Sequence, residues 1–320
     1  MYRISVVVTT YNQSYTDISR TLNSIVNQKF DHFEIIVTDD SSKKNPTQAL
    51  EQYFAEVGFP NYQIIVNSSN VGTVKNILGA LEIATGDYVK VLGAGDMMYA
   101  SDTLQKIDTF SRAHDIRLAF GKLKTYSIED DRPVIRSFNA PSKPEMYIFP
   151  QNREAVIEQQ LVWGDWIPAG SLFFKRDYIT NYFSLLATDY RVRYCEDFVS
   201  TLVALTDTID YFDEYLYWYE WGVGVSNNGS ASARKRMYAD HSNLYSELKR
   251  RYGNDKVVAK AYRLFRIKRF LMLHTPLSGL LTRFKTAQYL KVPKSQNEDV
   301  TPGKDFLDMN LSSPYTMKEA

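Results

Sequence analysis

Acidic side chains stand at three places where the chain is expected to turn. They are Asp39 with Asp40, Asp96, and the adjacent pair Glu196 and Asp197. A carboxylate can accept hydrogen bonds from ligand hydroxyl groups, hold Mg²⁺ together with phosphate oxygens, or remove a proton as a general base. An Asp at such a place is also a common turn or helix cap. The elements that position these residues therefore decide what chemistry they can do.

Four buried strands are predicted in the first 100 residues. They cover 4–8, 34–38, 62–66 and 88–92. The segments between them have apolar residues at helical spacing, for example Ile18, Leu22 and Ile25. Alternating strands and helices predict an α/β fold with a doubly wound, mostly parallel sheet, whose ligands bind at the carboxyl ends of the strands.

Each predicted strand ends in polar residues. In chain order these are Thr9, Tyr11 and Asn12, then Asp39 and Asp40, then Asn70, Gly72 and Lys75, and finally Asp96. The turn after the first strand, TTYNQ, lacks the glycine-rich dinucleotide fingerprint, which argues against a classical dehydrogenase. Two acidic strand ends suit a ligand whose base and ribose hydrogen-bond to carboxylates and whose diphosphate needs a cation.

Five motifs in this region occur in a recognisable order: VVVTTYNQ, SIVNQ, EIIVTDDSS, NVG followed by Lys75, and GDYVKVLGAGD. Together they resemble the donor half, about residues 1–100, of family 2 inverting glycosyltransferases, which have the GT-A fold. The resemblance implies a nucleotide diphospho-sugar donor, with UDP as the expected nucleotide. It implies donor contacts at Thr9, Tyr11, Asn12, Asp39, Asp40, Asn70, Gly72, Lys75 and Asp96.

The segment before Asp96 departs from the family pattern. The family commonly has two aspartates separated by one residue and then a further Asp, whereas this chain has Gly93, Ala94, Gly95 and Asp96. One carboxylate with diphosphate oxygens and water can still hold Mn²⁺ or Mg²⁺, so Asp96 is the expected metal ligand. Two alternatives stay open. Lys75 or a later base neutralises the leaving diphosphate, or the chain is a non-catalytic GT-A module that binds a nucleotide-sugar or a partner glycosyltransferase.

Residues 101–232 are the expected acceptor half of the GT-A domain. Residues 126–150 lack clear periodicity and are interpreted as a variable acceptor loop. Trp163 and Trp166 follow in a loop, and tryptophan faces stack on the apolar faces of sugar rings, so both are expected acceptor contacts. The structural alternative is that both rings belong to the core.

The pair Glu196 and Asp197 precedes a helical run that begins at Phe198. The structural alternative is a helix cap, because a helix N-terminus stabilises negative charge. The position of the pair resembles that of the acidic pair in family 2 enzymes, in which the Asp is the catalytic base. This implies that Asp197 removes the proton from an acceptor hydroxyl and that Glu196 binds or orients the acceptor.

Trp221 is a further expected acceptor contact. It precedes a Ser- and Asn-rich segment with Ser226 and Asn227, which in the family closes over the donor and which is otherwise interpreted as a linker. The expected reaction is transfer of a hexosyl group to a hydroxyl of a glycan, lipid-linked glycan or glycoprotein in surface polysaccharide or glycoconjugate synthesis. A nucleotidyltransferase is disfavoured, because no glycine-rich basic loop follows the first strand.

The single cysteine among the 320 residues, Cys195, excludes an internal disulfide. The N-terminal apolar run is too short for a signal peptide, and no window approaches the length of a membrane span, so we expect a cytoplasmic protein. The sequence leaves the oligomeric state open, and a homo-oligomer is compatible with it.

Basic residues gather near the C-terminus. Between Arg234 and Lys294 there are 16 Lys and Arg residues against three acids, a net charge of +13 in a chain of net charge +1. Residues 233–293 are interpreted as a basic helical extension after the GT-A domain 1–232, and 294–320 as a weakly ordered tail. The extension either packs on the domain or contacts anionic lipid through 255–291, at the inner face of the cell membrane. Nucleic acid is disfavoured, because no recognisable RNA or DNA module accompanies the basic residues.

Overall fold

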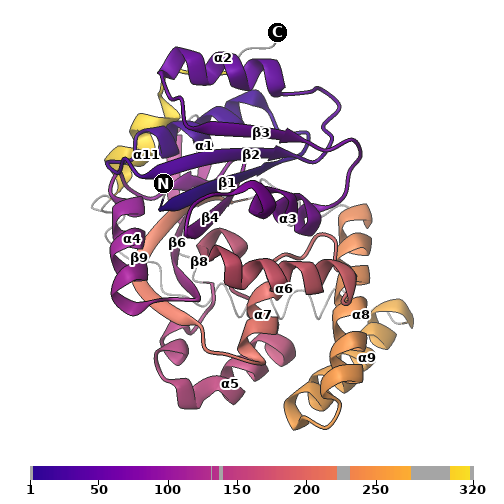
Figure 1. Cartoon of the computed structure of the whole chain (residues 1–320). Helices are drawn as coiled ribbons and strands as arrows, with labels where there is room; N and C mark the ends of the chain where they lie inside the picture. Colours follow the sequence, from indigo (N-terminus) through magenta and orange to yellow (C-terminus); the bar gives the residue numbers. More distant parts are fainter. Residues whose placement is uncertain (1–2, 131, 137–139, 222–230, 275–302, 318–320) are drawn as a thin grey trace.

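A computed structural model describes all residues except 1–2, 131, 137–139, 222–230, 275–302 and 318–320 (Figure 1). Its strands are β1 (Ile4–Thr10), β2 (Phe33–Asp39), β3 (Tyr62–Val66), β4 (Tyr88–Gly93), β5 (Met97–Met98), β6 (Leu118–Glu129), β7 (Arg132–Arg136), β8 (Leu172–Lys175) and β9 (Asp210–Glu220). Its α-helices are α1 (Tyr15–Val26), α2 (Thr47–Val57), α3 (Thr73–Ile83), α4 (Thr103–His114), α5 (Arg153–Glu158), α6 (Arg176–Thr188), α7 (Phe198–Ala204), α8 (Ala231–Tyr252), α9 (Lys256–His274) and α11 (Lys304–Leu311).

The strands form one sheet in the order β3-β2-β1-β4-β8-β6-β9-β5, with β7 paired to β6. Strands β3, β2, β1 and β4 run parallel, as do β6 and β9, and these pairings hold most of the paired residues. Strand β8 is antiparallel to both β4 and β6 and joins the two halves of the sheet. The prediction of a doubly wound, mostly parallel α/β sheet is confirmed.

Helices cover both faces of the parallel half, because its strands are apolar on both sides. Val7 of β1 faces the core that contains α3 and α6, whereas its neighbours Val6 and Val8 face the core that contains α1, α2 and α4. Strand β1 is therefore buried from Ile4 to Val8. The carboxyl ends of β1 and β2 are brought level, since Thr10 pairs with Asp39 and Thr9 with Gly93 of β4.

The acceptor half contains more sheet than the sequence predicted. Residues 126–150 were expected to be irregular, but β6 extends to Glu129 and pairs with β7. Strand β6 also makes a long parallel pairing with β9, interrupted by an irregularity near Lys122. The prediction of a wholly irregular loop is therefore wrong for β6 and β7, while the short helical turns at 144–152 fit it better.

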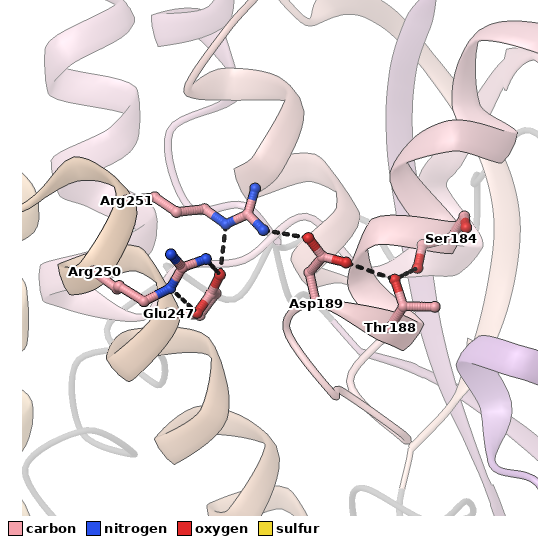
Figure 2. Close-up of polar contacts among 6 residues, drawn as sticks. All are labelled: Ser184, Thr188, Asp189, Glu247, Arg250 and Arg251. Carbon is pink, nitrogen blue, oxygen red and sulfur yellow. Dashed lines mark hydrogen bonds and ion pairs between the residues drawn. The ribbon is translucent and has the colours of Figure 1, made fainter.

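The C-terminal helices pack on the rest of the protein. Helix α8 is held to the C-terminal end of α6 by an ion pair from Arg251 to Asp189 (Figure 2). Within α8, Glu247 pairs with both Arg250 and Arg251. The apolar face of α8 and α9 joins the core of α3, α6 and α7 through residues such as Leu244. Residues 275–293 of the predicted basic extension and the segment with Ser226 and Asn227 lie outside the described residues.

Residues 303–317 do not fit the expectation of a weakly ordered tail. They form helix α11 and a following segment that lies against α1 (Figure 1). Leu307 is fully buried, the backbone N–H of Met317 donates to Ser19 Oγ at 2.7 Å, and Asn23 Nδ2 donates to the Tyr315 carbonyl at 3.0 Å. Burial of apolar residues that are far apart in sequence orders this segment.

Candidate active site

The turn after β2 fixes the loop after β3. Both carboxylate oxygens of Asp40 accept backbone hydrogen bonds, from Val71 at 2.7 Å and from Gly72 at 2.9 Å. Asp40 is almost completely buried. A buried carboxylate needs such donors to offset its lost hydration, so Asp40 shapes the loop that contains Asn70 and Gly72.

Asp39 also stabilises the turn after β2, by hydrogen bonds with Ser42 of the same turn. Its carboxylate accepts the N–H of Ser42 at 2.7 Å and the hydroxyl of Ser42 at 2.5 Å. Ser42 Oγ in turn accepts the N–H of Asn12, which lies after β1 in a left-handed conformation with φ 53°. Burial raises the pKa of Asp39, and Asp40 raises it further. The ends of β1 and β2 are thereby joined into one rigid edge.

Other expected donor contacts lie at the same edge of the sheet. Thr9 is half-buried, with its hydroxyl 3.5 Å from the carbonyl of Leu92. The ring of Tyr11 is 43% exposed, which leaves it accessible to a flat ligand group. Lys75 is exposed near the start of α3 and makes no hydrogen bond or ion pair with another described residue. The structure therefore brings the predicted donor residues together at the carboxyl edge.

Asp96 lies in a tight turn after β4. Its N–H donates to the carbonyl of Gly93 at 3.0 Å, and Gly95 has φ +107°, a conformation that glycine adopts without strain. Burial raises the pKa of Asp96 to about 7, and the ammonium of Lys90 opposes this shift. The turn thus leaves one carboxylate in a poorly hydrated place.

Lys90 is a functional candidate that the sequence analysis missed. It is fully buried in β4, and its ammonium donates to the carbonyls of Gly170 and, at 3.4 Å, of Leu172. Burial lowers the pKa of Lys90 to about 7, whereas Asp96 raises it. Its position inside the apolar run YVKVL was a signal, because an unpaired lysine is rarely buried in a strand.

The acidic pair precedes α7, but Asp197 does not cap that helix with its side chain. One carboxylate oxygen of Asp197 instead accepts the N–H of Ala169 at 2.6 Å. Burial raises the pKa of Asp197, and that hydrogen bond opposes the shift. Burial and the adjacent Asp197 charge raise the pKa of Glu196. The capping alternative is therefore wrong for the Asp197 side chain.

Asp96 and the acidic pair share one site. The charge on Asp96 contributes to the raised pKa of Glu196, and the charges on Asp96 and Asp197 both raise the pKa of Tyr219. Tyr217, on the same strand β9, lies over the Lys90 ammonium at 5.3 Å from ring centroid to nitrogen. Water and salt screen such interactions, so they are strong only between nearby charges or poorly hydrated ones. Ala169 binds Asp197 and the next residue, Gly170, binds Lys90, so the proposed base and the buried lysine lie close together.

The donor loop and the segment before the acidic pair are in direct contact. Arg193 Nη2 donates to Asn70 Oδ1 at 3.0 Å, and the Tyr194 hydroxyl donates to the same oxygen at 3.4 Å. The N–H of Val74 donates to the Arg193 carbonyl at 3.1 Å. Gly72 has φ +89°, and a Cβ there would lie 2.5 Å from that carbonyl oxygen. Only glycine allows this close approach.

The three expected acceptor tryptophans have different environments. Trp163 is 56% exposed and Trp221, at the end of β9, is 45% exposed. Trp166 instead packs on Phe198, with ring centroids 4.8 Å apart, and on His241 at 6.1 Å. The core alternative therefore describes the Trp166 contacts, while Trp163 and Trp221 are partly exposed to solvent.

The site fits a cation that arrives with a diphosphate better than a cation held by protein alone. Within the described residues, no group of three or more His, Cys, Asp or Glu side chains could hold a metal ion. Gly93 and Gly95 supply no ligand, and a Cβ on Gly93 would lie 3.6 Å from Asp96 Oδ2. Mg²⁺ commonly binds through one or two carboxylates, substrate phosphates and water, and Asp96 meets that requirement.

Known proteins resemble this chain in sequence and fold. An abequosyltransferase of Salmonella typhimurium is 30% identical over 182 residues, which is 54% of this chain and 53% of that protein. The chain spans about half the length of the curated relatives it matches first. A Staphylococcus aureus TarS structure with UDP-GlcNAc has a TM-score of 0.53 at 18% identity, covering 91% of this chain and 76% of that chain.

A mannosyltransferase of Pyrobaculum calidifontis, solved with GDP-Man and Mn²⁺, has a TM-score of 0.50 at 17% identity. That alignment covers 98% of this chain and 83% of the mannosyltransferase. The fold is therefore of the GT-A type. The profile of glycosyl transferase family 2 matches residues 5–178, from β1 through β8 into α6. The chain belongs to glycosyl transferase family 2.

Proposed function

We propose that this protein is an inverting glycosyltransferase that moves a hexosyl group from a UDP-sugar to a hydroxyl of a glycan or glycoconjugate acceptor. The observation that carries the proposal is the direct contact between the donor loop and the segment that leads into Glu196 and Asp197. A binding module needs the donor edge only, whereas the half-buried carboxylate of Asp197, which does not cap α7, suits a general base.

In the proposed reaction, Asp197 accepts the proton of the acceptor hydroxyl as its oxygen attacks the anomeric carbon. The bond from that carbon to the nucleoside diphosphate breaks on the opposite face, so the sugar configuration inverts. The Ala169 N–H fixes one oxygen of Asp197 and leaves the other for the acceptor. Burial raises the pKa of Asp197 towards the working pH, which strengthens it as a base.

Charge on the leaving diphosphate needs a positive partner. A bound Mn²⁺ or Mg²⁺ would neutralise that charge, and Asp96 is the residue that would hold it. Mn²⁺ is present in the Pyrobaculum mannosyltransferase, which supports this assignment. Lys75 is exposed at the donor edge and is the alternative partner. The UDP-GlcNAc in the TarS structure supports UDP as the nucleotide.

The acceptor side is expected to include Glu196 and the exposed rings of Trp163 and Trp221. Glu196 precedes the base directly, so it can accept a hydrogen bond from a second acceptor hydroxyl. Exposed tryptophan faces provide stacking surface for sugar rings. Trp166 is a weaker candidate, because Phe198 and His241 already cover part of its ring.

The exposed side chains of helix α9 support the proposal that the acceptor is linked to a lipid. Leu264, Ile267 and Phe270 recur at helical spacing with 43%, 56% and 62% exposure, and exposed Arg263 and Arg266 flank them. This pairing of apolar and basic side chains suits the surface of an anionic membrane. In the described part of the chain, no helix has the length and apolar character needed to cross a bilayer. The inner face of the cell membrane is therefore the proposed place of action.

Vesicle co-sedimentation tests this surface. Vesicles with phosphatidylglycerol should retain the protein more than vesicles of phosphatidylcholine alone, and Ile267→Glu should abolish the difference. The matched control is Met309→Glu, which alters an apolar side chain on α11 that is 45% exposed, against 56% for Ile267. Equal binding of the two variants would reject α9 as the contact surface.

Calorimetric titration tests the donor site. UDP, GDP and dTDP are titrated into the full chain with and without Mn²⁺, alongside Asp96→Asn and the exposed control Asp102→Asn on the approach to α4. We expect UDP to bind best, with an Mn²⁺ enhancement that Asp96→Asn loses and Asp102→Asn keeps. Binding that ignores Mn²⁺ would move charge neutralisation to Lys75, and failure of all three nucleotides to bind would reject the proposal.

A further inference from the structure

Asp240 of α8 is a buried acid that the proposed reaction does not use. Its side chain accepts three consecutive backbone N–H groups, from Arg193 at 3.1 Å, Tyr194 at 2.6 Å and Cys195 at 3.0 Å. Only 3% of Asp240 is exposed. Hydrogen bonds between backbone N–H groups and a buried carboxylate are strong, so Asp240 fixes the course of residues 193–195.

Residues 193–195 lead directly into Glu196 and Asp197. His241, which follows Asp240 in α8, contacts Phe198, the residue immediately after the acidic pair. The ring of His241 meets the ring of Phe198 edge-on, with centroids 4.9 Å apart and planes at 88°. Phe198 is 1% exposed. Asp240 therefore binds the backbone immediately before the acidic pair, and the adjacent His241 packs on the side chain immediately after it.

Other described contacts position the proposed base, and the donor loop binds Arg193 and Tyr194 through Val74 and Asn70. The Ala169 N–H binds one oxygen of Asp197, and the Asp197 carbonyl accepts from Ser200 within the first turn of α7. Among the described contacts, Asp240 is the group that accepts all three consecutive N–H groups ahead of Glu196. A shift of about 1 Å in a reacting group can cost on the order of 100-fold in rate, so the segment that carries the base must be held firmly.

We propose that Asp240 is a positioning residue for glycosyl transfer, and that α8 is therefore part of the active unit and not an appendage to it. This inference rests on the proposed function, because it takes Asp197 as the base. Asp240 acts through the backbone of residues 193–195 and touches neither donor nor acceptor. Its loss should lower kcat much more than it weakens nucleotide binding, because Asp40 holds the donor loop independently through Val71 and Gly72.

A purely structural role for Asp240 would be to dock α8, and the other end of α8 provides the matched control. Arg251 joins α8 to Asp189 (Figure 2) and lies over the Tyr190 ring at 5.3 Å, and none of its described contacts is with residues 193–195. Arg251→Ala therefore weakens the docking of α8 but leaves Asp240 in place to accept the N–H groups of residues 193–195. Comparison of the Asp240 and Arg251 variants therefore distinguishes a role in docking α8 from a role in positioning the acidic pair.

The experiment measures kcat, the donor KM, the UDP dissociation constant and the melting temperature for full-length Asp240→Ala, Asp240→Asn, Arg251→Ala and Asp197→Asn. Turnover is followed as UDP release from the UDP-sugar that the wild type uses best. Asp240→Ala should lower kcat by about 100-fold. Asp240→Asn keeps one acceptor oxygen and should recover part of that loss. Arg251→Ala should lower the melting temperature but change kcat by only about twofold, as for other partly exposed ion pairs.

Two results would overturn the inference: wild-type kcat in both Asp240 variants, or an equal loss of kcat in Arg251→Ala at equal loss of melting temperature. If Asp240→Ala does not fold, the near-isosteric Asp240→Asn still tests the inference. A loss of kcat larger than the loss of UDP affinity supports it, and equal losses reject it. Failure of the proposed function looks different, because Asp197→Asn would then keep its turnover whatever the Asp240 variants do.

Discussion

Gly72→Ala is the perturbation that most directly probes the junction between the donor loop and the acidic pair. Gly72 has φ +89°, and a Cβ at this residue would lie 2.5 Å from the Arg193 carbonyl oxygen and closer still to Arg193 Cγ. The backbone angle costs about 1–3 kcal/mol for an L-residue. The steric conflict adds about 1–3 kcal/mol, because the obstacle is backbone and cannot rotate away. The expected loss of unfolding free energy is therefore about 2–6 kcal/mol.

Urea unfolding of Gly72→Ala and of the control Gly58→Ala measures this loss. Gly58 ends α2 with φ +67°, but a Cβ there meets nothing within 4 Å. The control should lose only the strain of the left-handed conformation, about 1–2 kcal/mol. The folded fraction of Gly72→Ala should also turn over more slowly, because Arg193 leads into the acidic pair. Equal destabilisation by the two changes would refute the described contact between residues 72 and 193.

Three further predictions concern the site. Asp197→Asn and Asp197→Glu should both lower turnover by at least about 100-fold with little change in UDP binding, because a base must be both ionisable and correctly placed; this is read from steady-state kinetics and calorimetry. The turnover of the wild type should fall as the pH drops through about 6. Burial raises the pKa of Asp197 to about 6, and the protonated acid cannot accept a proton. A fall in turnover only below about pH 4, the ordinary range of an Asp, would contradict this. Trp163→Ala should raise the acceptor KM without lowering the melting temperature, whereas Trp166→Ala should lower the melting temperature, because Trp166 packs on Phe198.

The donor half follows from local sequence patterns. Continuous runs such as ISVVV form strands because β-branched residues pack well on both faces of a buried sheet. Each strand end then places its polar residues at one edge, so the positions of Asp39 and Asp96 could be predicted without knowing any tertiary contact. The prediction for 62–66 agrees with β3 in both bounds.

The other half depends on contacts between distant residues. Strands β6 and β9 mix aromatic, acidic and basic residues, so neither shows the apolar run of a buried strand, and their pairing spans about 90 residues. The interaction of Asp240 with residues 193–195 and the burial of Leu307 against distant elements leave no local periodicity. The sequence marks Lys90 as unusual within an apolar run, but it does not reveal the partners of Lys90, which are the carbonyl of Gly170 just before β8 and that of Leu172 in β8.

The anomeric configuration of the transferred sugar tests the central claim most directly. Wild type and Asp197→Asn are incubated with Mn²⁺, α-linked UDP-sugars and a panel of simple glycoside acceptors, and proton NMR follows the anomeric signal of the product from the first turnovers. The account predicts a β-linked product from the wild type and no detectable product from Asp197→Asn. An α-linked product, or equal turnover by the two proteins, would contradict it.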